Sequence, residues 1–98
     1  MADYILAKKA QEDLRKIWYY TVERWSEMQA DIYFHDLIQS LNLIAADPNA
    51  VGRSYDEVHT GYRGLSSGRH IIFYRILKNG KVRIIRVLHE RMDFGRHL

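Results

Sequence analysis

Residues 70–89 read HIIFYRILKNGKVRIIRVLH, which is two apolar runs joined by the turn sequence Lys78-Asn79-Gly80-Lys81. Asn-Gly between apolar runs is the strongest short-range signal for a β-hairpin, and it predicts a two-residue type I′ turn. We therefore expect strands over 70–77 and 82–89. In such a hairpin, mirror positions about the Asn79–Gly80 bond face each other.

This register gives the predicted hairpin two different faces. Arg75 and Arg86 lie on one face, Arg83 lies on the other, and His70 stands opposite His89. Both faces are otherwise mainly apolar, so neither strand is expected at an exposed edge. Helices can cover one face, and the C-terminal tail or a partner protein must cover the other. Because the chain has little left for this purpose, we expect a partner surface.

Upstream of the hairpin, the spacing of apolar residues predicts one short strand, at 4–6, and two helices. The first helix begins at Ala7, and its apolar stripe is Ala10, Leu14, Ile17, Trp18, Thr21 and Trp25. Ser26 and Gln29 have the spacing of a capping box, which predicts the start of a second helix. Its stripe is Ala30, Phe34, Leu37, Ile38, Leu41, Ile44 and Ala45.

The second helix is expected to end at Asp47-Pro48-Asn49, because proline cannot continue the helical hydrogen bonds. Residues 50–61 have no apolar period and predict a loop, and YRGLS at 62–66 predicts a further strand. We therefore expect an α+β fold in one domain, 1–98. It has a short N-terminal strand, an antiparallel helix hairpin and a three-stranded antiparallel meander, with one sheet packed on the helices.

The charge of this chain of 98 residues, +3 overall, is unevenly distributed. Residues 1–50 contain five Lys or Arg against eight Asp or Glu, and residues 51–98 contain ten against four. The basic second half is therefore expected to attract nucleic acid or an acidic protein. The chain has no cysteine, no signal-peptide pattern and no run of about 18 apolar residues, so we expect a cytoplasmic protein without membrane contact.

Candidate chemistry concentrates near the hairpin and the tail HERMDFGRHL at 89–98. His70 and His89 could share a metal with His97 or Asp93, but without a metal-binding motif we expect neither metal nor cofactor. Arg75 and Arg86 either pair with a helix carboxylate, Glu12 or Asp13, or bind phosphate. No serine has the context of a catalytic nucleophile.

The whole chain resembles the RelE/ParE superfamily of bacterial toxins, and most closely its ParE branch. The resemblance is carried by AKKAQEDLRKI (7–17), WSEMQADIY (25–33), HIIFYRI (70–76), RVLHERMD (86–93) and the final HL. It implies the toxin of a type II toxin–antitoxin system, neutralised by a ParD-like antitoxin. It also implies DNA gyrase as the target, with DNA contact that is direct or passes through gyrase.

RelE-like members of the superfamily are instead ribosome-dependent endoribonucleases. Of their basic and tyrosine positions, one aligns with Ile71, one with Arg91 and one with His97, so the nuclease set is incomplete here. We therefore expect a toxin that is not an enzyme, with Arg91 and His97 as the catalytic residues if the ribonuclease alternative holds. A third alternative is a partner-binding module without toxicity.

The resemblance and the charge together place the target-binding surface on the hairpin and the tail. Its predicted residues are Arg75, Arg86, His89, Arg91, Met92, Asp93, Arg96 and His97. The antitoxin is expected along the exposed side of the helix hairpin and at sheet edges, without individual residues assigned.

Overall fold

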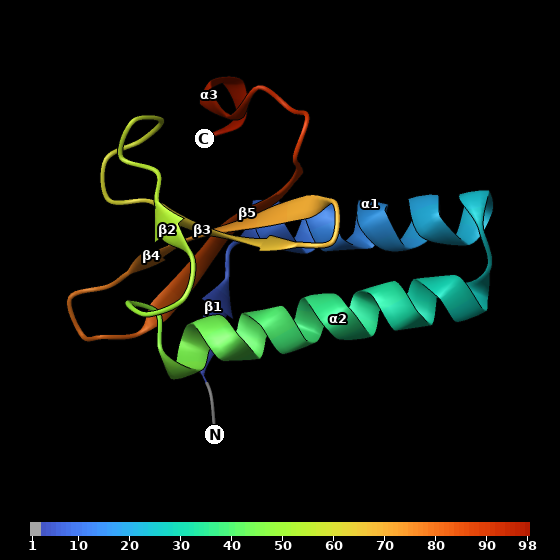
Figure 1. Ribbon diagram of the computed structural model, residues 1–98, viewed down its shortest axis with the longest axis horizontal. Coiled ribbons are helices and arrows are strands. Elements are labelled where there is room, and N and C mark those ends of the chain that lie inside the picture. Colours follow the sequence, from blue (N-terminus) through green and yellow to red (C-terminus); the bar gives the residue numbers. More distant parts are fainter. Residues whose placement is uncertain (1–2) are drawn as a thin grey trace.

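A computed structural model describes residues 3–98 of the chain (Figure 1). The elements in order are β1 (Tyr4–Leu6), α1 (Lys8–Arg24), α2 (Glu27–Ala46), β2 (Arg53–Ser54), β3 (Arg63–Ser67), β4 (His70–Ile76), β5 (Val82–His89) and α3 (Phe94–His97). The strands form one mixed sheet in the order β1-β5-β4-β3-β2, in which β1 runs parallel to β5 and the other neighbours are antiparallel. The predicted α+β order is confirmed, and β2 and α3 are additional.

The helix hairpin begins and turns where the sequence predicts. Ser26 is the N-cap of α2, and its hydroxyl accepts a hydrogen bond from the backbone N–H of Gln29 at 3.0 Å. Every residue of the predicted α2 stripe is buried or half-buried. The α1 stripe ends at Thr21 and not at Trp25, because Trp25 lies beyond the helix and 73% of it is exposed.

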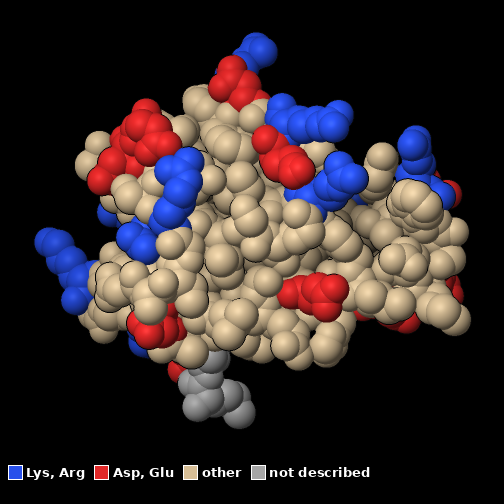
Figure 2. Space-filling view, in the orientation of Figure 1, with Lys and Arg blue, Asp and Glu red and all other residues tan. Residues whose placement is uncertain are grey.

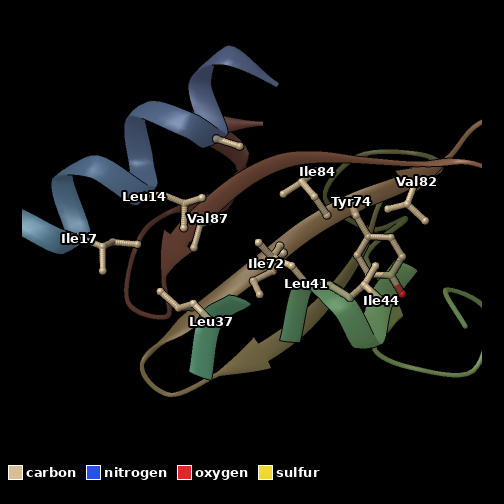
Figure 3. Packing of buried hydrophobic residues seen from close by; sticks show 11 residues of the cluster. Leu14, Ile17, Leu37, Leu41, Ile44, Ile72, Tyr74, Val82, Ile84 and Val87 are labelled. Carbon is tan, nitrogen blue, oxygen red and sulfur yellow. The ribbon is translucent and has the colours of Figure 1, made fainter. Parts of the chain in front are cut away.

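The main hydrophobic core lies between the helices and one face of the sheet (Figure 3). Its fully excluded residues are Ala10, Leu41, Ile44, Ile72, Tyr74 and Ile84. The Tyr74 hydroxyl lies within hydrogen-bond distance of two carbonyls around the end of α2, 2.7 Å from that of Pro48 and 2.8 Å from that of Val51, and its one proton is shared between them. The buried hydroxyl of this large aromatic side chain therefore has hydrogen-bond partners.

The turn of the β4–β5 hairpin differs from the predicted type I′ turn. Gly80 has φ of 84°, but Asn79 does not have a positive φ. The N–H of Gly80 donates to the carbonyl of Leu77, and the N–H of Leu77 donates to the carbonyl of Lys81. This is a three-residue loop that needs only one left-handed residue, the glycine.

The longer loop shifts the register by one residue, and a β-bulge later reverses the shift. Near the turn, Arg75 pairs with Arg83, whereas beyond the irregularity at Phe73/Tyr74 the pairing follows the predicted register and His70 faces His89. Arg83 is therefore on the same face as Arg75, which corrects the prediction. The predicted register would have turned the Arg83 guanidinium towards the helices in place of Val82 and Ile84, which are now buried there.

The outer face of the sheet carries a second, smaller apolar cluster. Tyr55, Ile71, Phe73 and Leu88 form it, and Val58, Phe94 and Leu98 cover it from the loop and the tail. The ring of Tyr55 packs so closely on β3 that a Cβ at Gly64 would lie 2.6 Å from it. The expected partner is thus not required to cover this apolar face, because the chain's own irregular segments do so.

Candidate functional site

The outer face near the hairpin turn is strongly basic. Arg75 and Arg83 are directly opposite each other across β4 and β5, and both are exposed. Directly paired positions bring Cβ atoms to about 4.5–5.5 Å, where two like charges destabilise a sheet. The arrangement therefore has a cost that a neighbouring anion would relieve.

The start of α1 adds two more cations beside this pair. Lys8 and Lys9 occupy the first turn of the helix, which contains no acidic residue, and both are exposed. Because β1 pairs with β5, with Leu6 opposite Ile84, the chain enters α1 alongside the arginines. Cations at a helix N-terminus oppose the helix dipole.

These residues line one groove of about 510 Å³, hereafter the basic groove. Its lining consists of Ala7, Lys8, Lys9, Tyr62, Arg75, Leu77, Arg83, Ile85, Arg86, His97 and Leu98. Five of these residues are Lys or Arg and none is Asp or Glu, so the basic groove concentrates positive charge. Figure 2 shows a face on which Lys and Arg are interspersed with Asp and Glu around a largely uncharged centre.

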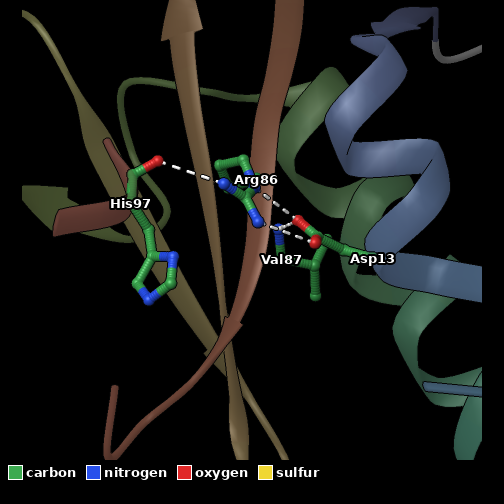
Figure 4. A network of polar contacts seen from close by, with 4 residues as sticks. All are labelled: Asp13, Arg86, Val87 and His97. Atoms are coloured by element: carbon green, nitrogen blue, oxygen red, sulfur yellow. Dashed lines mark hydrogen bonds and ion pairs between the residues drawn. The ribbon is translucent and has the colours of Figure 1, made fainter. Parts of the chain in front are cut away.

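Arg86 anchors the floor of the basic groove to α1 (Figure 4). Its guanidinium donates to both carboxylate oxygens of Asp13, at 2.7 and 2.9 Å, and to the backbone carbonyl of His97 at 3.1 Å. Asp13 also accepts the N–H of Val87 at 3.0 Å. The Asp13 hydrogen bonds raise the pKa of Arg86. Of the two predicted alternatives for Arg86, the ion pair with a helix carboxylate is the one found.

A second cleft, of about 500 Å³, lies between the helix hairpin and the opposite end of the sheet. It is lined by Tyr20, Thr21, Trp25, Gln29, Tyr33, Arg69, His70 and His89. The two histidine rings meet edge to face with their centres 5.4 Å apart, and Tyr33 Oη lies 2.6 Å from His70 Nδ1. Burial, and then the neighbouring His89, lower the pKa of His70 to about 4.

This histidine pair has no third metal ligand in the structure. The candidates were His97, which lies beside the basic groove, and Asp93, which is exposed in the tail. Among residues 3–98, no group of three or more potential ligands is close enough to hold a metal ion. The N–H of Arg91 donates to His89 Nδ1 at 3.2 Å, so that nitrogen already has a partner.

The sequence matches a family model described as the ParE toxin of the type II toxin–antitoxin system parDE, over residues 4–94. This chain belongs to the ParE toxin family. Toxin ParE1 of Mycobacterium tuberculosis is 43% identical over 95 residues, covering 97% of this chain and 96% of that protein. Toxin ParE1 of Caulobacter vibrioides is 39% identical over 98 residues, covering 100% and 99%.

The ParE fold is also seen in a solved structure. A chain of the chromosomal ParDE toxin–antitoxin system from P. aeruginosa superposes with a TM-score of 0.77 at 22% identity, covering 91% of this chain and 96% of that one. This likeness shows the fold, and the family match with the two relatives confirms the predicted resemblance to the ParE branch. Within the described residues 3–98, neither long helix is apolar enough to cross a membrane.

In this ParE-family toxin, the predicted target-binding residues do not form one cluster. Arg75, Arg86 and His97 line the basic groove, while His89 lines the second cleft. The remaining four are exposed on the tail and line neither of these two sites: Arg91, Met92, Asp93 and Arg96. The His97 imidazole points away from Arg86, so only the backbone of His97 joins that network (Figure 4).

Among the charged and aromatic residues of the basic groove, sequence reasoning missed four, namely Lys8, Lys9, Arg83 and Tyr62. Lys8 and Lys9 could have been found from the sequence, because two adjacent lysines in the first turn of a helix oppose the helix dipole and so indicate a role other than stability. The predicted two-residue turn places Arg83 on the wrong face, because the loop has three residues. Tyr62 is predicted only as the first residue of a strand.

Proposed function

We propose that this ParE-family toxin inhibits growth by poisoning DNA gyrase, that it does not cleave RNA, and that a ParD-like antitoxin neutralises it. The resemblance to the ParE branch supports gyrase as the target. The single observation that supports a non-nucleolytic mechanism is the environment of Ile71.

Ile71 occupies the position that aligns with an arginine of RelE-like nucleases. Its side chain is only 7% exposed and packs with Phe73 and Leu88 in the outer apolar cluster. A nuclease of this kind needs cations around the scissile phosphate to stabilise the charge that develops there. With Ile71 in place of one cation and His97 in place of the tyrosine, Arg91 is the one position of the set that keeps its residue type.

The proposed target surface combines the basic groove with the exposed tail. Arg75 and His97 belong to the groove, and Arg91, Met92, Asp93 and Arg96 are exposed on the tail that leads to His97. We assign Arg86 a positioning role, because three of its five N–H donors are bound by Asp13 and by the carbonyl of His97. His89 is outside this surface, in the second cleft.

The proposed antitoxin surface is the exposed side of the helix hairpin. Large apolar side chains are solvent-exposed there, and they are Tyr19, Tyr20, Trp25, Met28, Ile32 and Leu43. Aromatic residues and methionine are enriched at protein interfaces, where burying them supplies affinity. The basic second half of the chain would attract an acidic antitoxin segment over a longer range.

Two reactions with the purified toxin test this function against the ribonuclease alternative. One contains gyrase and plasmid DNA, and the other contains a translation system with labelled mRNA. We expect gyrase-dependent DNA cleavage and intact mRNA. Codon-phased mRNA cuts without DNA cleavage would establish the RelE-like alternative, with Arg91 and His97 at its centre, and activity in neither reaction would favour a non-toxic binding module.

Point variants are better suited than truncation for locating the target surface. Arg91→Ala alters an exposed side chain and should weaken gyrase poisoning while the protein stays folded. Removing the tail after Asp93 would also remove Phe94 and Leu98, which cover Phe73. A truncated toxin could therefore fail through unfolding. Full poisoning by Arg91→Ala would remove that residue from the surface.

A further inference from the structure

The basic groove contains four cations that no carboxylate neutralises. Among residues 3–98, the ion pairs join Asp13 to Arg86, Glu57 to Arg53 and Asp36 to His35, so none involves Lys8, Lys9, Arg75 or Arg83. Asp13, the acid bonded to the groove floor, is shared between Arg86 and the N–H of Val87, and the charge of Glu12 also acts on Arg86. The groove therefore has an unbalanced positive charge.

Two independent features of the groove are unfavourable to the fold by themselves. Arg75 and Arg83 are a like-charge pair directly opposite each other on the sheet, and Lys8 and Lys9 oppose the dipole of α1. Local choices that conflict with stability tend to concentrate at functional sites. An anionic ligand in the groove would relieve both conflicts at once.

An aromatic platform stands at the rim of the same groove. Tyr62 lines it, and the ring of Tyr62 stacks on His59 with centres 4.0 Å apart and planes 16° apart. His59 is exposed and Tyr62 is half-buried, so the stack is partly accessible to solvent. Strands β3 and β4 are antiparallel and Arg63 pairs with Tyr74, so Tyr62, one residue before Arg63, lies next to Arg75.

We propose that the basic groove binds a single-stranded nucleic acid directly, with phosphates on Arg75, Arg83, Lys8 and Lys9 and a base stacked on Tyr62. Guanidinium groups bind phosphate through two donors at once, and aromatic rings beside a cationic track accept bases of any sequence. An acidic peptide would use the cations but not the flat ring. This goes beyond gyrase poisoning, which does not require the toxin itself to hold DNA.

The test is fluorescence anisotropy of a labelled oligothymidine of about 12 nucleotides, within the range that small single-strand-binding domains cover. The full-length toxin is titrated without gyrase at several salt concentrations. We expect binding that weakens with salt, because each neutralised phosphate contributes about −0.7 to the slope of log affinity against log salt. Absence of binding at low salt would overturn the proposal.

The cationic half of the proposal is tested by two double variants that remove the same charge. Arg75→Gln/Arg83→Gln alters the groove, and Arg15→Gln/Arg24→Gln alters exposed positions of α1 outside it. We expect the groove variant to lose at least about tenfold in affinity and about 1.4 in salt slope, and the control to stay within about twofold. Equal losses in both variants would show only general attraction to a basic protein, which contradicts a specific groove.

The aromatic half is tested by Tyr62→Leu against Tyr62→Phe. A stacked base should be lost in the leucine variant, with affinity down several-fold and an unchanged salt slope, and retained in the phenylalanine variant. Two further probes exclude other ligands: a duplex of equal length and polyglutamate of matched charge. Tighter binding of either, or indifference to Tyr62→Leu, would overturn single-strand recognition. Because gyrase is absent, these results are independent of the test of gyrase poisoning.

Discussion

On the helix side of the β4–β5 hairpin, Ile72, Tyr74 and Ile84 are completely excluded from solvent, whereas on the outer side Arg75 and Arg83 are exposed. The inner face is covered by α1 and α2 except at one end, where the second cleft lies. The outer face is covered only at one end, where the loop and the tail place Tyr55 and Phe94 over Phe73.

This difference shows how a small domain divides one hairpin between stability and recognition. The inner face supplies most of the buried apolar surface, which is the main favourable contribution to folding. The outer face then tolerates a like-charge pair next to the turn, because the fold does not depend on packing there. The two faces should accordingly respond in opposite ways to substitution.

The largest expected effect distinguishes two adjacent isoleucines of β5. Ile84 is fully buried in the main core, whereas Ile85 is the half-buried residue at the bulge and lines the basic groove. Ile84→Ala should lower the free energy of unfolding by about 3 kcal/mol, because it leaves a cavity in the core. Ile85→Ala should cost less than about 1 kcal/mol.

Urea denaturation of the two variants measures this directly. The predicted two-residue turn would have placed Ile85 on the helix face and Ile84 on the outer face. A larger loss for Ile85→Ala would therefore mean that the bulge is absent and that the hairpin keeps one register throughout.

Asp13 is the point at which the two faces are joined, and its loss should have the next largest effect. Its side chain is 9% exposed, and it accepts two hydrogen bonds from Arg86 and one from the N–H of Val87. Asp13→Ala leaves a half-buried guanidinium and a buried N–H without their acceptor, so we expect a loss of about 2–3 kcal/mol.

Glu12→Ala is the matched control, because Glu12 is the neighbouring carboxylate and is exposed. It should change the free energy of unfolding by less than about 0.5 kcal/mol. Thermal unfolding of both variants gives the comparison. If the two lose equally, the Asp13 network does not stabilise the fold.

The order of elements could be predicted from the sequence because each depends on a local pattern. The stripe of α2, the cap at Ser26 and the strand positions all follow from spacing alone, and the structure confirms them. Asn79-Gly80 failed as a guide to register because the same two residues fit a two-residue loop and a three-residue loop. Burial of Val82 and Ile84 against the helices favoured the second, and no local pattern contains that information.

The candidate site could be predicted only in part, because local patterns do not show which distant segments meet. A carboxylate partner for Arg86 is predictable, since a cation in an apolar strand requires one, and Asp13 is one of the two predicted partners. The meeting of Lys8 with Arg83 depends on the parallel pairing of β1 with β5, which joins the two ends of the chain. The covering of the outer face by Phe94 and Leu98 likewise has no periodic signal.

The end of the inner face, where the dry core gives way to the second cleft, should respond to pH. His70 has a pKa of about 4 in the folded protein against 6.5 ordinarily, mainly because it is buried and also because His89 is near. Between these two values the unfolded chain binds a proton that the folded chain does not, so stability falls as the pH falls through this window. Because the ring is partly solvated, we expect a loss of about 1–2 kcal/mol.

The measurement is the free energy of unfolding in urea at pH 7 and at pH 4.5. His70→Asn, which has no titrating ring, should lose less stability on acidification than the parent by that amount. His35→Asn serves as the control, because the His35 side chain is 70% exposed, and it should behave as the parent does. An unchanged pH response in His70→Asn would assign the loss to other groups.

The smallest expected effect on stability, and the sharpest contrast with the inner face, is at His97. The network around Arg86 uses the backbone carbonyl of His97, which alanine retains, and the exposed imidazole takes no part in it. His97→Ala should therefore change the free energy of unfolding by less than about 0.5 kcal/mol. If the imidazole contacts the target, affinity should fall about tenfold, corresponding to about 1.4 kcal/mol. Urea denaturation measures the stability, and growth inhibition on induced expression, compared with that of His35→Ala, reports the loss of target binding. Undiminished toxicity of His97→Ala would show that the imidazole does not contact the target.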